Sequence, residues 1–239
     1  MEQDREKIQK EIRTQSEVIL EKFENEYIYD ENGNYFKEVS KKNFTDGVFE
    51  GDLDDMNRRN GYGIFRYHNG DIYAGQWRDN KANGEGYYFF ANGDRYEGEL
   101  MNERKHGKGK YYFFRNGNTY NGMWEHDKRE GYGEFIYRLT NEKYVGYWEN
   151  GFKHGQGKFH FSNGDIYEGK FLKGNKSGIG KIIYVNGTEF HGEWREDKLV
   201  RGRFNWKVTW NWKDDLRKRR HIRRRVHELE EAWLRNIQI

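Results

Sequence analysis

The sequence predicts an all-β protein, a single-layer antiparallel β-hairpin solenoid flanked by N- and C-terminal α-helices. Three observations predict this fold. A nine-residue phrase recurs, reading NGDIYAGQW at Asn69–Trp77 and NGDIYEGKF at Asn163–Phe171. A G-x-G stands ahead of each copy, and the steps between those glycines are 23, 23, 24, 24 and 23 residues. Short strand-like runs flank the Asn-Gly pairs, which is a hairpin signal, and a fixed period of this length is typical of repeat arrays.

The composition is compatible with a repeat array and excludes several other classes. Among 239 residues, 35% are charged and only 34% hydrophobic, but 18% are aromatic, which is unlike a disordered chain. The absence of cysteine excludes disulfides and thiolate metal sites and favours a reducing compartment. The charged N-terminus does not resemble a signal peptide, and no apolar run is long enough for a membrane-spanning helix.

Composition and pattern divide the chain into four parts. Residues 1–26 are expected to form a charged helix, because apolar residues recur at helical spacing. Residues 27–60 form an atypical initial segment with a half-repeat, since end repeats are usually degraded. Residues 61–204 hold about six hairpin units. Residues 205–239 form a Trp-rich exit segment and a basic amphipathic helix.

Strand parity decides the type of turn at Asn69-Gly70. A two-residue type I′ turn would place Tyr67 and Tyr73 on opposite faces of the sheet. A type I turn with Gly70 as a left-handed G1 bulge pairs Tyr67 with Asp71 instead, and brings the recurring aromatic residues to one face. We therefore expect the G1 turn, in which the glycine takes a conformation that other residues adopt only with strain.

The same parity predicts an aromatic ladder lining a groove, with one face of a single-layer sheet left partly uncovered. We expect protein partners, including a helix, to occupy this groove, and the chain's own C-terminal helix is one candidate occupant. The predicted groove residues are Phe65, Tyr67, Tyr73, Trp77, Tyr96, Tyr120, Trp124, Tyr144, Trp148, Tyr167, Phe171 and Trp194.

Counting from the third Asn-Gly adds Tyr112 and Phe114 to the ladder. The same count places a second apolar patch on the other face of the sheet, where the fifth unit carries Lys158 and His160. This predicted outer-face patch consists of Tyr87, Phe89, Tyr111 and Phe113.

The C-terminal segment is strongly basic. Residues 201–239 contain 12 Lys or Arg and 5 Asp or Glu, a net charge of +7. An anionic membrane, an acidic protein surface such as a tubulin tail, and a solvated capping helix all remain open. Nucleic acid is the least favoured partner, because the array shows no basic stripe with base-stacking geometry. The predicted basic helix carries Arg217, Lys218, Arg219, Arg220, Arg223, Arg224 and Arg225.

No catalytic, cofactor or metal site can be assembled from the sequence. The G-x-G pairs lead into strands, and residues 174–181 (GNKSGIGK) have the wrong glycine spacing for a phosphate loop. His106 and His154 recur two units apart, too far to share a metal ion. The recurring Asp71, Asp94 and Asp165 follow turns and fit turn chemistry. We therefore expect a non-enzymatic protein without a cofactor.

The recurring pattern G-x-G-x(3)-Y/F-x-N-G-x-x-Y-x-G-x-W resembles the MORN (membrane occupation and recognition nexus) repeat, over roughly residues 44–204. The departures are Glu142 at the turn glycine, and Leu100 and Phe171 in place of Trp. The resemblance implies a single-sheet solenoid without catalytic activity. Arrays with short helical ends are similar to axonemal and radial-spoke scaffolds, which implies a cytoplasmic, cytoskeleton-associated scaffold, with the cilium as one setting. A membrane-surface adaptor that binds anionic lipids through the basic helix is the alternative.

Overall fold

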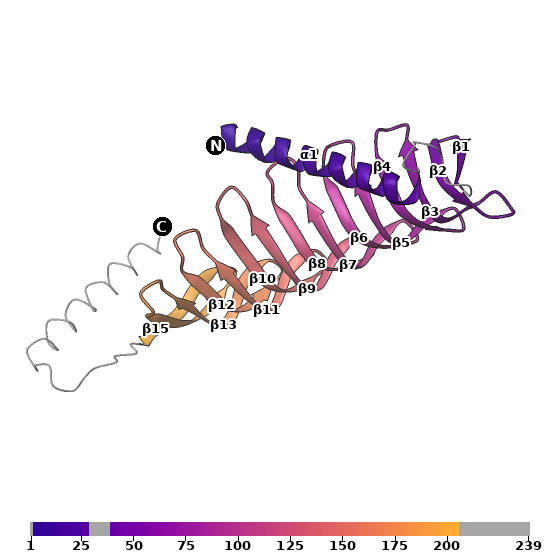
Figure 1. Ribbon diagram of the computed structural model, residues 1–239. Helices are drawn as coiled ribbons and strands as arrows, with labels where there is room; N and C mark the ends of the chain where they lie inside the picture. Colours follow the sequence, from indigo (N-terminus) through magenta and orange to yellow (C-terminus); the bar gives the residue numbers. More distant parts are fainter. Residues whose placement is uncertain (1, 29–38, 206–239) are drawn as a thin grey trace, which may run out of the picture. The chain divides into compact units, whose positions relative to one another are not determined.

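The protein folds as one open antiparallel sheet with a helix on one of its faces (Figure 1). The computed structural model describes residues 2–28 and 39–205. Within these ranges, α1 (Glu2–Tyr27) precedes fifteen strands, each hydrogen-bonded to the strands before and after it in sequence. The predicted single-layer antiparallel array and the N-terminal helix are confirmed. The predicted C-terminal helix lies outside the described residues.

The strands alternate between nine- or ten-residue and seven- or eight-residue lengths through most of the array, because each unit contributes one strand on each side of its turn. The strands are β1 (Val39–Phe44), β2 (Gly47–Leu53), β3 (Arg59–Tyr67), β4 (Ile72–Arg78), β5 (Lys81–Phe89), β6 (Arg95–Met101), β7 (Arg104–Tyr112), β8 (Thr119–Glu125), β9 (Lys128–Tyr137), β10 (Glu142–Glu149), β11 (Phe152–His160), β12 (Ile166–Leu172), β13 (Asn175–Ile183), β14 (Glu189–Arg195) and β15 (Lys198–Asn205).

The turn predicted at Asn69-Gly70 is confirmed. The amide of Gly70 donates to the Tyr67 carbonyl at 3.0 Å, and the amide of Tyr67 donates to the Asp71 carbonyl at 2.9 Å. Gly70 has φ +91°, as a G1 bulge requires. Phe65 therefore pairs with Tyr73 across the ladder, which places both rings on one face of the sheet.

The opposite ends of the strands close with a second type of turn that the sequence analysis did not assign. At Asp79-Asn80 both residues have positive φ, +49° and +69°, and Arg78 pairs directly with Lys81. These are the features of a two-residue type I′ turn, for which Asn and Asp are favoured. Next to it the register shifts between Gly75 and Trp77, a bulge that bends the strands.

The third unit corrects the predicted faces of four aromatic residues. Its turn is one residue longer: the Phe113 amide donates to the Asn118 carbonyl, whereas the first unit has only three residues between its paired positions. Tyr111 pairs with Tyr96 and with Tyr120, so Tyr111 and Phe113 lie on the aromatic face and not on the outer face. Tyr112 and Phe114 are not ladder members, because parity has to be counted from the G-x-G.

The fourth unit lacks the turn glycine, and an asparagine replaces it functionally. Asn141 takes the left-handed conformation with φ +56°, immediately before Glu142. Asparagine tolerates this conformation better than other non-glycine residues. Where Trp is replaced, Leu100 and Phe171 remain buried, with 5% and 1% of their surfaces exposed.

Turn side chains tie each hairpin to the next. The carboxylate of Asp71 accepts hydrogen bonds from the Ala91 amide at 2.8 Å and from the Tyr88 hydroxyl at 3.0 Å, both in the following unit. Asp94 and Asp165 accept equivalent amide bonds from the units that follow them. The recurrence of Asp at this place is therefore structural, as expected from turn chemistry, and it also connects neighbouring units.

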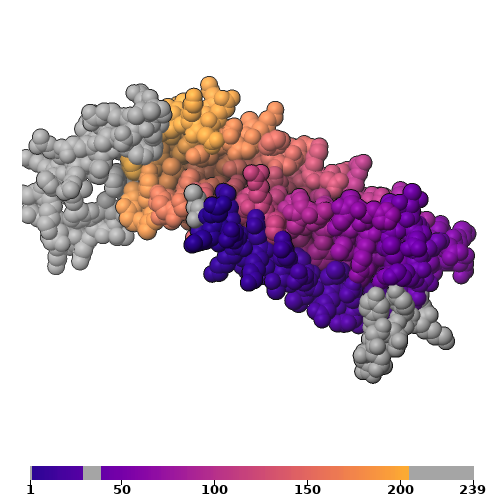
Figure 2. All heavy atoms as spheres, turned by 90° about the horizontal axis from the view of Figure 1, so that it is seen from above, coloured from indigo at the N-terminus to yellow at the C-terminus, as the bar shows by residue number. Residues whose placement is uncertain are grey.

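Helix α1 lies on the face of the sheet opposite the aromatic ladder, which we call the helix face (Figure 2). Phe23 is buried against Ile64 and Ala74, and the ring of Tyr27 stacks on Tyr62 at 4.5 Å. Glu24 forms an ion pair with Arg66. A charged helix of marginal intrinsic stability is thus held by tertiary packing along one side.

Each buried tyrosine of the ladder packs against neighbouring glycines that leave no room for a side chain. A Cβ at Gly169 would lie 2.6 Å from the Tyr167 hydroxyl oxygen and 2.7 Å from the Gly180 Cα. We expect Gly169→Val to lower the free energy of unfolding by about 1–3 kcal/mol, as overpacking does. Chemical denaturation measures this loss. Lys170→Val, at the exposed neighbouring position, is the control and should change stability little. Equal stability of the Gly169 variant and the parent would contradict the ring-over-glycine packing.

The anchoring of α1 depends on few side chains. Phe23 is 6% exposed, whereas Val18 on the same helix is 57% exposed. We expect Phe23→Ala to cost about 3 kcal/mol of docking energy and to remove hydrogen-exchange protection from the amides of residues 2–27. Protection of β9–β15 should persist, because α1 contacts other hairpins. Val18→Ala is the control, and similar exchange in both variants would argue against this docking.

Candidate functional site: the aromatic face

The ladder tyrosines lie flat over the glycines of their own and the following strand. The Tyr73 hydroxyl donates a hydrogen bond to the Gln76 carbonyl at 3.0 Å, and a Cβ at Gly86 would lie 2.5 Å from that hydroxyl. The geometry repeats at Tyr96, Tyr120, Tyr144 and Tyr167, each of which donates to the carbonyl three residues later. Ring and backbone therefore form one continuous packed layer.

The tryptophans complete this layer from the adjacent strand position. Trp77 Nε1 donates to the Gly63 carbonyl at 3.1 Å, and its ring meets Tyr73 edge-on at 5.2 Å. Trp124 and Trp148 make equivalent bonds to Gly109 and Gly133. Edge-to-face aromatic pairs contribute about 0.5–1.5 kcal/mol each beyond the area they bury.

This packing corrects the predicted exposure of the groove. Of the twelve residues assigned to it, Tyr67 is half-buried and the other eleven are buried. Tyr73, Tyr96, Tyr120, Tyr144 and Tyr167 have no exposed surface. These residues form the core of the array and cannot be the atoms that a partner touches. The prediction failed because parity gives a residue's face but not what covers it.

A row of basic side chains covers the rings, and the sequence analysis missed it. Arg129 lies 4.4 Å from the Trp148 ring centroid and 5.4 Å from that of Phe135. Lys153 lies 5.0 Å from Phe159 and 5.4 Å from Phe171. We call this set the cation row; its members are Arg59, Lys105, Arg129, Lys153 and Lys176.

The signal for the cation row is present in the sequence. A basic residue stands two positions before the G-x-G in five of the six units, and Ala82 is the exception. In the ladder these positions pair with the Trp row, as Trp124 does with Arg129. The array therefore carries a basic stripe, which the sequence analysis considered only in connection with base stacking. Long basic side chains pack their alkyl stems on apolar surface while the charged end stays near water.

Burial lowers the pKa values of several members of the cation row. Desolvation lowers the pKa of Lys153 and of Arg129, and it also lowers the pKa of Arg59. Arg129 donates to the Gly151 carbonyl at 2.6 Å, and Lys105 pairs with Asp127 at 3.1 Å. Within the ranges that the structure describes, no carboxylate pairs with Arg59, Arg129, Lys153 or Lys176.

The accessible rings of the aromatic face stand next to the Asn-Gly turns. We call them the rim aromatics; they are Tyr67, Phe90, Phe113, Tyr137, Phe161 and Tyr184, all half-buried. Because the strands bend at the bulges, the cation row approaches this rim. Lys105 Nζ lies 5.7 Å from the Phe90 centroid, and Lys176 Nζ lies 5.6 Å from that of Phe161. Rings and cations thus form one combined surface on successive hairpins.

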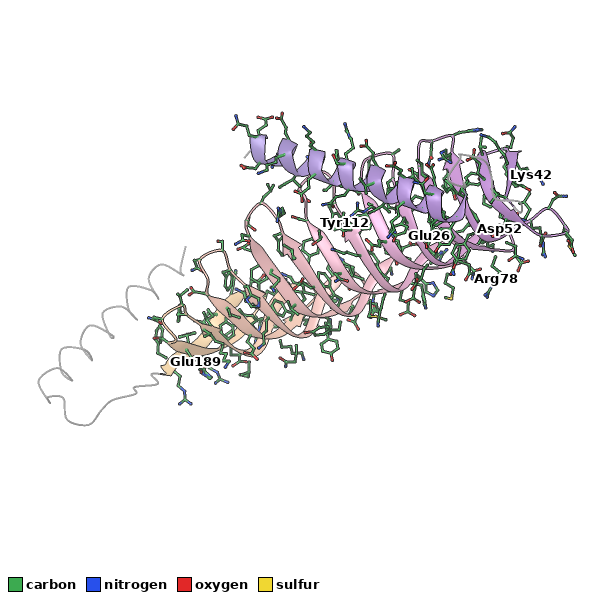
Figure 3. All side chains as sticks on the ribbon, in the orientation of Figure 1. Glu26, Lys42, Asp52, Arg78, Tyr112 and Glu189 are labelled. Carbon is green, nitrogen blue, oxygen red and sulfur yellow. The ribbon has the colours of Figure 1, made fainter. Side chains whose placement is uncertain are left out.

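The helix face differs in chemistry. Tyr87 belongs to the cluster packed under α1, and Phe89 stacks beside it at 6.5 Å, so two of the four residues of the predicted outer-face patch do lie on this face. A cleft of about 640 Å³ between α1 and the sheet is lined by charged residues, including Glu26 and Glu97. Figure 3 shows the labelled Glu26 and Tyr112 on this side of the sheet. Farther along, Tyr132 and Tyr147 meet edge-on, with 56% and 52% of their surfaces exposed.

The remaining predicted features divide between the described and undescribed residues. The basic helix that includes Arg217 and Arg225 lies outside the described residues. In the described part of the chain, no group of three or more metal-ligating side chains comes together. His154 contacts Glu149 at 2.9 Å. No helix of the described residues is long and apolar enough to cross a bilayer.

Comparison with known proteins identifies the repeats. The MORN repeat profile matches residues 55–72, 73–95, 96–118, 120–138, 144–166 and 167–189, which together exceed half of the chain. A search of curated proteins returns no match.

Solved structures provide a distant likeness. The TCP domain of Drosophila melanogaster SAS-4 (dCPAP), solved with a proline-rich motif of Ana2, is 14% identical over 71% of this chain and 90% of that one, with a TM-score of 0.40. The TCP10 domain of Danio rerio CPAP is 11% identical over 70% of this chain and 78% of that one, with a TM-score of 0.43.

Stability should depend on pH through the ladder tyrosines. Burial raises the pKa of Tyr167 to about 12, above its ordinary value near 10. The folded state therefore favours the neutral phenol, and this contribution is complete below about pH 10 and lost as the pH rises through about 12. We expect the urea midpoint to fall between about pH 10 and 12, and to fall less steeply in Tyr167→Phe. A midpoint independent of pH would contradict burial of the phenols.

Proposed function

Because the chain belongs to the MORN repeat family, we propose that it is a non-enzymatic scaffold or adaptor that binds partner proteins along its aromatic face. The observation that carries this proposal is the combined surface of rim aromatics and cation row, repeated on successive hairpins. Aromatic residues and arginine are the residue types that dominate protein interfaces. The buried ladder serves as the support for this surface.

The repeat architecture favours an elongated protein partner. Most hairpins present the same pair of features, a half-buried ring and a cation, so the contacts add up along the array. A partner that follows several hairpins gains several weak contacts at once. A small ligand would engage one unit, and neither the ring nor the cation of one unit forms an enclosed site.

A second exposed surface supports a bridging role. Tyr132 occupies the place in its unit that Tyr62 occupies in the first, where the ring of Tyr27 covers it. Tyr132 and Tyr147 have no such cover within the described residues. A partner on this part of the helix face can be bound together with one on the aromatic face, because the two surfaces lie on opposite sides of the sheet.

The setting we propose is a large cytoskeletal assembly, with the ciliary axoneme as its leading candidate. This follows the resemblance to arrays with helical ends in axonemal scaffolds. The second candidate function is a membrane-surface adaptor. The observation that favours it is the net charge of +7 in residues 201–239, which suits anionic lipid headgroups.

Site-specific photo-crosslinking tests the scaffold function. A benzoylphenylalanine at Phe161, on the aromatic face, should crosslink a protein from a detergent-resistant cytoskeletal extract. Phe161→Glu should then weaken binding of the purified partner about tenfold or more, because a desolvated interface ring is replaced by a charge. The same probe and substitution at Phe152 serve as the control, since Phe152 is 56% exposed and lies on the other face of the same hairpin.

Equal crosslinking and equal affinity loss at the two positions would overturn the assignment of the aromatic face. Sedimentation with phosphatidylserine vesicles, lost on changing Arg217–Arg225 to glutamate, would favour the membrane adaptor instead.

A further inference from the structure

Four consecutive hairpins place a cation at the same point of the aromatic face. Lys105, Arg129, Lys153 and Lys176 stand at the second paired position beyond the type I′ turns, in β7, β9, β11 and β13. Each lies within 6 Å of at least two ring centroids. The rings confine the side chains, so the distance between successive cations is fixed, unlike the distance between mobile basic side chains on a surface.

Few carboxylates contact the row on its own face. Asp197 and Glu142 act on Lys153 through space, but neither forms an ion pair with it in the described residues. Lys105 alone has a carboxylate in contact, from Asp127. The strand positions of this face that surround Arg129, Lys153 and Lys176 are mostly aromatic, aliphatic or glycine, as in Tyr144, Gly146 and Trp148. An acidic residue, Glu142, also stands on this face in β10, opposite Tyr137. A half-buried cation without a counter-charge attracts an anion more strongly than a solvated one, because the surrounding dielectric is lower. The surface is therefore complementary to an acidic ligand.

The spacing of the row selects the conformation of that ligand. Two strands separate successive cations, a step of about 9.6 Å. A polyproline II helix has three residues per turn and rises about 9.3 Å per turn. Seven residues of an α-helix rise about 10.5 Å. Over the three steps between four cations the polyproline helix drifts by about 1 Å and the α-helix by about 3 Å. Only the former keeps every site in hydrogen-bond reach.

We propose that the aromatic face binds an acidic, proline-rich segment of a partner protein in the polyproline II conformation, with Asp or Glu at every third residue facing the cation row. The intervening residues, proline above all, pack against the rim aromatics, as proline-rich segments do on aromatic surfaces. This inference rests on the proposed scaffold function and names the chemistry of its partner. A flat membrane fits less well, because the cations are half-buried among rings.

Synthetic peptides test both the charge and the period. The probe is fluorescein-labelled (Glu-Pro-Pro)4, and the composition-matched control is (Glu-Glu-Pro-Pro-Pro-Pro)2. Fluorescence anisotropy with the full chain should give about tenfold tighter binding of the probe. The affinity should fall with added salt, and (Lys-Pro-Pro)4 should not bind. Equal affinity for the two acidic peptides would overturn the spacing argument, and binding of (Lys-Pro-Pro)4 would overturn the charge argument.

Matched variants locate the binding. Lys153→Met with Lys176→Met removes two charges while the flexible Met side chain keeps contact with the rings. This variant should lose about tenfold or more in affinity for the probe. Lys158→Met with Lys170→Met removes the same charge from exposed positions on the other face and should change affinity less than about twofold. Thermal melting confirms that each variant is folded, and equal losses in both would overturn the site.

The outcomes separate this inference from the scaffold function. If a partner crosslinks at Phe161 while neither acidic peptide binds, the acidic proline-rich chemistry is wrong and the scaffold function stands. If Phe161 captures no partner and no peptide binds, both fall. Binding to phosphatidylserine vesicles that depends on Lys153 and Lys176 would assign the row to lipid and overturn the peptide.

Discussion

The contact between a tyrosine ring and two paired glycines determines most of this structure. A sheet one layer thick has no second layer to bury its side chains, so its core must form on its own surface. Tyr73 solves this by lying over Gly75 and Gly86, with its hydroxyl bonded to the Gln76 carbonyl. Any Cβ at those glycines would occupy the space of the ring. The glycine period and the tyrosine period are therefore one constraint, which also fixes strand register.

The cation row follows from the same geometry. Once the tyrosines and tryptophans lie flat, their outer surfaces would be exposed to solvent. Covering them with further apolar side chains would only create another large exposed hydrophobic patch. Arginine and lysine satisfy both requirements, because their stems cover the rings while their charges prevent aggregation. Cation–π attraction of about 0.5–1 kcal/mol per contact partly offsets the desolvation that lowers the pKa of Lys153. The basic side chains that cover the core thereby also create a surface that favours acidic over basic partners.

The sequence was sufficient to predict the turn type, the strand pairing and the single sheet, because each of these depends on one periodicity. It was not sufficient to predict which side chains are buried, because burial depends on how the strands bend and on which side chains cover the rings. The G1 turn at Gly70, the pairing of Phe65 with Tyr73 and the single sheet all follow from period and parity. Parity counted from the turn misassigned Tyr111, because one extra residue in a loop inverts every face assignment made from that end. Burial of the ladder could not be predicted, since it depends on the bend at the bulges. The basic residue before five of the six G-x-G pairs is a period that the sequence shows, but position in the sequence alone does not reveal that these side chains lie over the rings.

The two faces of the sheet are consequently suited to different tasks. On the helix face, α1 packs against the first hairpins through Phe23, Tyr27 and Glu24, so recognition there depends on which hairpins the chain's own helix leaves open. On the aromatic face the core is already satisfied, and a partner gains little from burying Tyr120 or Trp148 further. What remains to be satisfied there is charge, at Arg129, Lys153 and Lys176, together with the outer edges of the rim aromatics. Selectivity on this face must therefore come from the partner's spacing of carboxylates more than from its apolar content, because the cations repeat with a fixed step and, apart from Lys105, have no ion-pair partner in the described residues.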